Sequence, residues 1–177
     1  MKNRILKEVI SWLIVFAAAF LLAILINKFV ILNEEIPSGS METTIMTGDK
    51  VLTFRLAYLF GKPERGDIVV FPFPDDESVD YIKRIIGLPG ETVVIKDGEV
   101  FINQSEEPLE EPYVKEPWDE EGDADYYTFV VPENSYFMMG DNRRDSLDSR
   151  YWKTPFVSED KIKSKALFRY PNFKWLK

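Results

Sequence analysis

The sequence contains neither histidine nor cysteine. Without cysteine there is no disulfide and no thiol nucleophile, so an exported domain would depend on its hydrophobic core alone. Without either residue the usual zinc ligands are missing, and we expect no metal and no other cofactor. A serine nucleophile in this chain could not use histidine as its base. Lysine is then the leading candidate for that role.

Basic residues are outnumbered, with 22 Lys and Arg against 30 Asp and Glu and a net charge of −8. Because nucleic-acid-binding domains are basic, we expect no nucleic-acid partner. Much of the acidic excess is local, since residues 106–125 carry ten acidic side chains and one basic side chain, Lys115. The same stretch contains three prolines. It predicts a solvated acidic loop or insertion over about 104–125.

Charge is absent altogether between Val9 and Ile26, inside a mainly apolar run that continues to Leu32. A membrane-spanning helix needs about 20 apolar residues, so we predict a single transmembrane anchor over residues 9–32. A helix buried in a soluble domain is an alternative, but the lack of any charged face disfavours it. A cleaved secretory signal is a second alternative. The run is long for such a signal, and its only Ala-x-Ala, at residues 17–19, lies in its middle.

The charges on either side of the apolar run predict its orientation. Basic residues precede it and two glutamates follow it: Lys2, Arg4 and Lys7, then Glu34 and Glu35. Basic flanks stay in the cytoplasm. We therefore expect a cytoplasmic N-terminus over residues 1–8, a single pass through the cell membrane, and an extracytoplasmic domain over residues 33–177.

After the apolar run, short β-branched and aromatic segments alternate with turns of Gly, Pro and Asp. This pattern predicts a mostly β domain built from antiparallel sheet, and Asp97-Gly98 predicts a tight hairpin. Residues 58–61 fit either a short helix or an extended loop. The expected strands are 50–54, 67–71, 81–86, 92–96, 99–102, 126–131, 136–139 and 162–170.

Two serines stand one glycine apart directly after the apolar run, in Pro37-Ser38-Gly39-Ser40-Met41. Pro37 fixes its own φ, and Gly39 leaves the backbone beside Ser40 open, as a closely approaching substrate backbone requires. An ordinary polar surface turn has the same composition. This segment alone therefore does not distinguish a nucleophile from a turn.

A candidate base lies in the expected strand 81–86, where alternation places Tyr81, Lys83 and Ile85 on one face. A lysine between large apolar neighbours has a lowered pKa and can take a proton from a serine hydroxyl. A lysine reaching to solvent from a strand edge is the alternative.

A third segment, residues 140–150, is dense in Asp, Asn, Arg and Ser. It can form either a charge-assisted hydrogen-bond network or an ordinary polar surface turn.

Taken in order, these segments resemble the signature motifs of the bacterial type I signal peptidases (leader peptidases) of peptidase family S26. Members of that family are Ser/Lys enzymes that remove signal peptides outside the membrane. The single anchor and the small size resemble the Gram-positive form. The matching segments are residues 37–41, 48–51, 65–71 with 81–91, and 140–150.

The resemblance implies a membrane-anchored serine endopeptidase that cleaves N-terminal signal peptides from exported preproteins at Ala-x-Ala-type sites. It implies that Ser40 is the nucleophile and Lys83 the general base. It also implies an oxyanion hole made by the Ser40 N–H and the Ser38 hydroxyl. Its partners would be secretory preproteins and the lipid bilayer.

The resemblance assigns supporting roles to four further residues. Ser146 would hydrogen-bond and orient the Lys83 amine, and Asp148 would pair with Arg150 beneath the site. Met41 would lie against the site.

The sequence departs from the family pattern at two places. Thr43 stands where the family usually has Pro, and Lys153-Thr154-Pro155 stands where a Gly usually follows Tyr151-Trp152.

A catalytically inactive relative that binds signal segments or partner proteins is the alternative function. A self-cleaving Ser/Lys repressor would need a DNA-binding domain and no membrane span, and the sequence offers neither.

Overall fold

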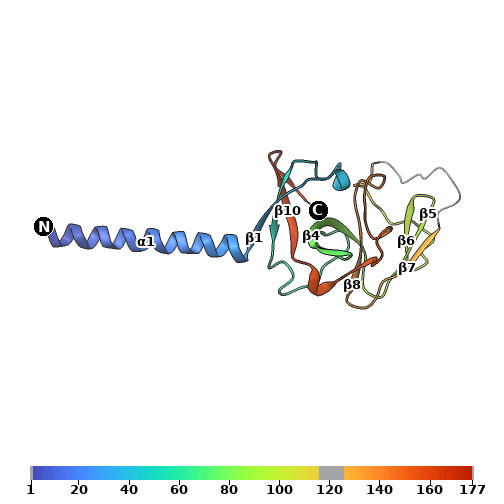
Figure 1. Ribbon diagram of the computed structural model, residues 1–177, viewed down its shortest axis with the longest axis horizontal. Helices are drawn as coiled ribbons and strands as arrows, with labels where there is room; N and C mark the ends of the chain where they lie inside the picture. Colours follow the sequence, from blue (N-terminus) through green and yellow to red (C-terminus); the bar gives the residue numbers. More distant parts are fainter. Residues whose placement is uncertain (1, 116–125, 177) are drawn as a thin grey trace.

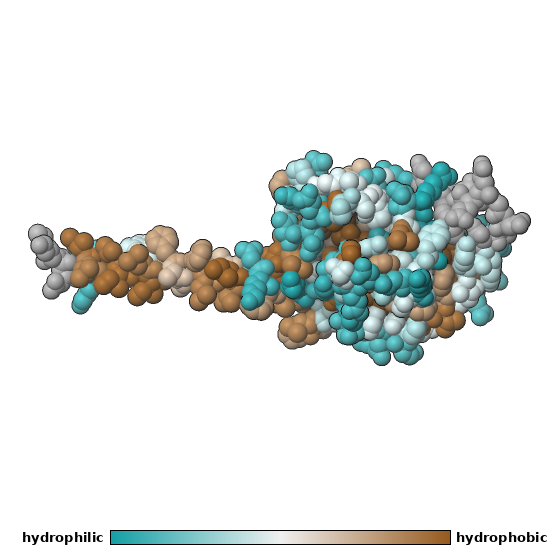
Figure 2. Space-filling view, viewed as in Figure 1, coloured by the Kyte–Doolittle hydropathy of each residue, from teal (hydrophilic) through white to brown (hydrophobic). Residues whose placement is uncertain are grey.

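The computed structural model describes residues 2–115 and 126–176. Helix α1, Lys2–Phe29, projects from one side of a β domain (Figure 1). By length and composition it could cross a membrane, and its surface is predominantly apolar (Figure 2). Helix α1 ends at Phe29, before the expected end of the anchor at residue 32, and Ile31 and Leu32 pair with Phe54 and Thr53 in an antiparallel ladder.

The regular elements in the remainder of the described chain are short strands and two single turns of 3₁₀ helix. Their bounds are β1 Ile31–Glu35, η1 Gly39–Met41, β2 Lys50–Phe54, β3 Ile68–Phe73, β4 Asp76–Gly87, β5 Thr92–Lys96, β6 Glu99–Ile102, β7 Tyr127–Val130, β8 Ser135–Met139, β9 Phe156–Ser158, η2 Glu159–Lys161, β10 Ser164–Tyr170 and β11 Lys174–Trp175.

Eight strands form one sheet in the order β1-β2-β10-β3-β4-β8-β9, with β11 beside β10. Strands β6-β5-β7 form a smaller sheet, at the end of the domain farthest from α1 (Figure 1). Every pairing is antiparallel. The predicted mostly β, antiparallel domain behind one apolar helix is confirmed.

All eight predicted strands are present, and three others, β1, β9 and β11, were not predicted. Strand β4 starts at Asp76, five residues earlier than expected, because its polar first half still pairs with the end of β3. That half shows no hydrophobic alternation, which is the signal that sequence interpretation relies on. Residues 58–61 form turns.

The middle of the large sheet is buried on both faces, since β3 and β8 are buried at consecutive positions. In β3, Ile68 and Val70 pack with Met41 in one cluster, while Val69 and Phe71 pack in another. The smaller sheet packs on β4 and β8 through a third cluster that includes Phe137. Strand β4 lies between β3 and β8 and is therefore held firmly by its neighbours.

Candidate active site

Ser40 lies in the single turn η1, which directly follows the loop after β1, and it is only 6% exposed. Its carbonyl oxygen accepts a hydrogen bond from the Asn142 backbone N–H at 3.1 Å. The Asn142 side-chain amide donates to the Gly39 carbonyl oxygen at 3.0 Å. Two hydrogen bonds from Asn142, in the polar segment 140–150, therefore hold the serine turn in place.

Lys83 lies in the middle of β4, opposite Val69 of β3, and is only 4% exposed. Its Nζ is 2.7 Å from Ser40 Oγ, to which it donates a hydrogen bond across 43 positions of sequence. It also donates to the Ile82 carbonyl oxygen at 3.1 Å. The structure thus brings together the two residues that the sequence marked as nucleophile and base.

The surroundings of Lys83 favour its neutral form. Burial lowers its pKa from 10.5 to about 8, and the negative charges of Asp148 and Asp141 oppose that change. The Tyr81 ring, with its centroid 5.1 Å from Nζ, forms part of the cover, as strand alternation predicted. A substantial fraction of this amine is unprotonated at mildly alkaline pH. When neutral, it can accept a proton from the Ser40 hydroxyl.

The Ser38 hydroxyl lies 3.3 Å from Ser40 Oγ, close enough to share a hydrogen bond with it. Both serines open onto a cleft of about 310 Å³. Apolar and acidic side chains form its walls, with the two reactive groups at its base. The lining residues are Pro37, Ser38, Gly39, Ser40, Val79, Asp80, Tyr81, Ile82, Lys83, Asp145 and Leu147.

The expected hydrogen bond from Ser146 to the Lys83 amine is not formed. Ser146 Oγ is buried and has no hydrogen-bond partner. It lies instead against Gly140, where an added Cβ would be 2.2 Å from Ser146 Oγ and 2.4 Å from the Ser40 carbonyl oxygen. The Ser146 hydroxyl is therefore next to the serine turn, while the amine is satisfied by Ser40 and Ile82.

The expected pair of Asp148 and Arg150 is present and fully buried. Arg150 Nε donates to Asp148 Oδ1 at 2.8 Å, and an Arg150 terminal nitrogen donates to Oδ2 at 2.9 Å. Asp148 Oδ2 also accepts the Gly140 backbone N–H at 3.0 Å. This pair fixes Gly140, and through it the contact with Ser40.

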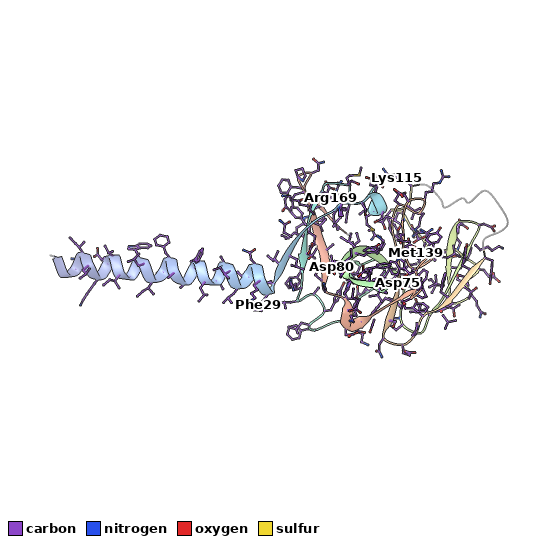
Figure 3. All side chains as sticks on the ribbon, in the orientation of Figure 1. Phe29, Asp75, Asp80, Lys115, Met139 and Arg169 are labelled. Atoms are coloured by element: carbon purple, nitrogen blue, oxygen red, sulfur yellow. The ribbon has the colours of Figure 1, made fainter. Side chains whose placement is uncertain are left out.

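Met41 is completely buried in the apolar cluster behind the serine turn, so it packs against the site without lining the cleft. The two departures from the family pattern have defined structures. The Glu42–Thr43 peptide bond is cis. The backbone N–H groups of Lys153 and Thr154 donate to the Asp75 carboxylate, which fixes the loop that follows Trp152. In the view of Figure 3, the exposed residues Asp75 and Asp80 are labelled near the middle of the domain.

Sequence interpretation missed a buried ion pair behind the site. Arg84 donates to both carboxylate oxygens of Asp141, at 2.8 and 2.6 Å, and Thr44 Oγ1 donates to the same carboxylate. Arg84 is next to Lys83 on β4, and Asp141 is next to Gly140. Both residues lie inside motifs that the sequence analysis had singled out. Their position in these motifs was the only sequence signal that they belong to the site.

Residues 104–115, the described part of the predicted acidic loop, contain no helix or strand and are mostly exposed, but two of their side chains pack inward. Glu111 accepts hydrogen bonds from both terminal nitrogens of the buried Arg143, and Tyr113 covers Arg84. Residues 116–125 lie outside the described residues. Across 2–115 and 126–176, no cluster of three or more acidic residues is arranged to hold a metal ion.

Comparisons with known proteins point to one family. A family model described as "Signal peptidase, peptidase S26" matches residues 9–172. The "Probable signal peptidase I-2" of Synechocystis is 39% identical over 157 residues, which cover 86% of this chain and 68% of that relative. "Signal peptidase IB" of Staphylococcus aureus is 32% identical over 178 residues, which cover 93% and 90% of the two chains.

The crystal structure of a signal peptidase I from Enterococcus faecalis is 34% identical in sequence to this chain. The alignment covers 59% of this chain and 96% of that chain, with a TM-score of 0.49.

Proposed function

The chain belongs to the signal peptidases of peptidase family S26, and on that premise we propose that it is a membrane-anchored signal peptidase I with a Ser40–Lys83 catalytic dyad. The observation that carries the proposal is the 2.7 Å contact between Lys83 Nζ and Ser40 Oγ at the base of a cleft. In a chain without histidine, this buried amine is the base within reach of a serine.

The reaction proceeds in two steps. Neutral Lys83 takes the proton of Ser40 as Oγ attacks the scissile carbonyl carbon, and the ammonium then protonates the leaving amine. The product is an ester on Ser40, and water hydrolyses it with Lys83 again serving as base. The oxyanion of each tetrahedral intermediate is held by the Ser40 N–H and the Ser38 hydroxyl.

The preprotein binds in an extended form along β4. Among the described strands, β8 pairs with β4 only from Arg84 onward, so the segment before Arg84 pairs with β3 alone. An added strand can hydrogen-bond along such an edge and place its scissile bond beside Ser40. We propose that the cleft beside Ser40 receives residues of an Ala-x-Ala-type site, as the family resemblance implies.

The lipid bilayer is the second partner. We propose that α1 crosses the cell membrane once, with the basic N-terminus in the cytoplasm and the β domain outside. Only one residue separates α1 from β1, so the domain lies directly on the membrane (Figure 3, Phe29). The β2–β3 loop and the β10–β11 turn, on the α1 side of the domain (Figure 1), expose apolar side chains, including Phe60 at 96% and Phe173 at 76%.

Cleavage of a purified preprotein tests this function and separates it from that of an inactive relative. The wild-type protein in detergent should release the mature chain with a new N-terminus directly after the signal peptide, as mass spectrometry would show. Ser40→Ala should release none. If wild type binds the preprotein but leaves it intact, the inactive relative is the correct description.

A further inference from the structure

Two residues of the segment between β6 and β7 contact the arginines behind the active site. Glu111 and Tyr113 shortly precede Lys115 in the sequence, and Figure 3 labels Lys115 where the described part of the acidic segment ends. The Tyr113 hydroxyl donates to Glu111 Oε1 at 2.7 Å. A pair of residues that satisfy each other and two buried cations is unlike the solvated surface expected of an acidic loop.

Glu111 is the partner of Arg143. The Arg143 side chain is 2% exposed, and its two terminal nitrogens donate to the two oxygens of Glu111, which is itself 9% exposed. Burial lowers the pKa of Arg143, but the Glu111 carboxylate more than offsets this effect and raises it. Arg143 Nε donates to the Gly140 carbonyl oxygen at 3.1 Å. Glu111 therefore aims Arg143 at the glycine that contacts Ser40.

The Tyr113 ring packs on the Arg84 guanidinium. The Arg84 guanidinium carbon lies 3.8 Å from the centroid of the Tyr113 ring, which is a close cation–π stack. One face of the Arg84 guanidinium stacks on this ring. The stacking orients the guanidinium for its two hydrogen bonds to the Asp141 carboxylate. Asp141 directly follows Gly140 and receives the Thr44 hydroxyl.

The two contacts converge on the serine turn. Gly140 and Asp141 precede Asn142, whose backbone and side chain bond the Ser40 and Gly39 carbonyl oxygens. An error in the position of residues 140–142 is therefore transmitted to Ser40. Because displacement of a reacting group by about 1 Å can cost about 10²-fold in rate, such support matters to turnover.

We infer that Glu111 and Tyr113 are positioning residues of the active site, which act through Arg143 and Arg84 to hold the Ser40 turn against Lys83. This inference rests on the proposed function of Ser40. It places part of the acidic segment in the support of catalysis, and it assigns no contact with the preprotein to either residue. Loss of either side chain should lower kcat and leave KM nearly unchanged.

The test compares Glu111→Gln and Tyr113→Phe with wild type in the full-length protein in detergent. Each change keeps the shape of the side chain and removes the paired charge or the hydroxyl. We expect kcat for preprotein cleavage to fall about 10- to 100-fold in Glu111→Gln. In Tyr113→Phe, which keeps the ring over Arg84, we expect a fall of about threefold. KM should stay within about twofold of wild type in both.

A second tyrosine–glutamate pair provides matched controls. Tyr136 also donates its hydroxyl to a glutamate, Glu159, and neither residue contacts Ser40 or residues 140–142 in the hydrogen bonds of the described chain. Tyr136→Phe and Glu159→Gln should change the thermal midpoint without the selective loss of kcat. If these controls lose as much kcat as their counterparts, the effect is general destabilisation and the inference fails.

The remaining outcomes are also decisive. Should Glu111→Gln not fold, Tyr113→Leu, which removes the ring over Arg84, carries the test, and a kcat equal to wild type overturns the inference. The inference is also wrong if both variants fold and raise KM at constant kcat, since that pattern indicates a substrate contact. If wild type and Ser40→Ala are equally inactive, the proposed function itself fails and the inference loses its premise.

Discussion

At the scale of single residues, the site depends on a lysine that is kept largely out of water. Lys83 is buried on a central strand, and this burial lowers its pKa to about 8. The same amine lies 2.7 Å from Ser40. Desolvation and contact are both needed, because an exposed lysine would stay protonated and a distant one could not reach the hydroxyl.

Ser38 provides the most direct residue-scale prediction. If its hydroxyl stabilises the oxyanion, Ser38→Ala should lower kcat by about 10²-fold with little change in KM, because the interaction forms only in the transition state. Ser38→Thr keeps a hydroxyl and should retain most of the activity. Steady-state kinetics on a preprotein measure both constants, and unchanged turnover in Ser38→Ala would rule out the role.

The sequence singled out Ser40 and Lys83 from local signals and the structure brings them together, while their catalytic roles stay predictions. Ser40 and Lys83 were found because a nucleophile candidate and a base candidate stood in recognisable segments. The partner of Ser146 was predicted wrongly, because a hydroxyl can rotate to several neighbours and only packing decides among them. The pairing of Glu111 with Arg143 spans 32 positions, and nothing in either segment indicates that they meet.

At the scale of elements, the segment 140–150 acts as a support for the serine turn. It bonds the turn through Asn142 and approaches it most closely at Gly140. The ion pair of Asp148 and Arg150 holds the segment from beneath. The strands themselves were predictable from β-branched runs and Asp-Gly turns, whereas β1 was hidden because its first residues continue the apolar run of the anchor.

Gly140→Ala tests this support. The new Cβ would lie 2.4 Å from a backbone oxygen of Ser40, so the turn must shift. We expect the free energy of unfolding to fall by about 1–3 kcal/mol and kcat to fall at least about tenfold. Gly61→Ala is the control, since nothing lies within 4 Å of its added Cβ. Denaturant unfolding and cleavage assays give the two values, and a fully active Gly140→Ala would contradict this description.

At the scale of the whole molecule, the apolar helix and the β domain have different roles. The helix is not buried by the domain, and the domain's apolar clusters contain no residue of α1. We therefore propose that the helix contributes membrane location more than stability. Placing enzyme and preprotein in one bilayer raises their effective concentration.

Removal of residues 2–29 should separate these contributions. The truncated domain should cleave a short soluble peptide at nearly the wild-type rate. It should cleave a preprotein embedded in lipid vesicles about 10²-fold more slowly than the full chain, because the encounter is no longer confined to the membrane. Equal rates on the embedded preprotein would show that α1 does not contribute in this way.

The pH dependence of kcat/KM tests the Ser40–Lys83 dyad most directly. Only neutral Lys83 can act as base, and its pKa is about 8. In wild type, kcat/KM should therefore rise about tenfold per unit below pH 8 and level off above it. Lys83→Ala should lose this limb and about 10²–10⁴-fold of the rate. If Lys83→Ala kept near-wild-type cleavage, or if it showed the same limb as wild type, Lys83 would not be the base.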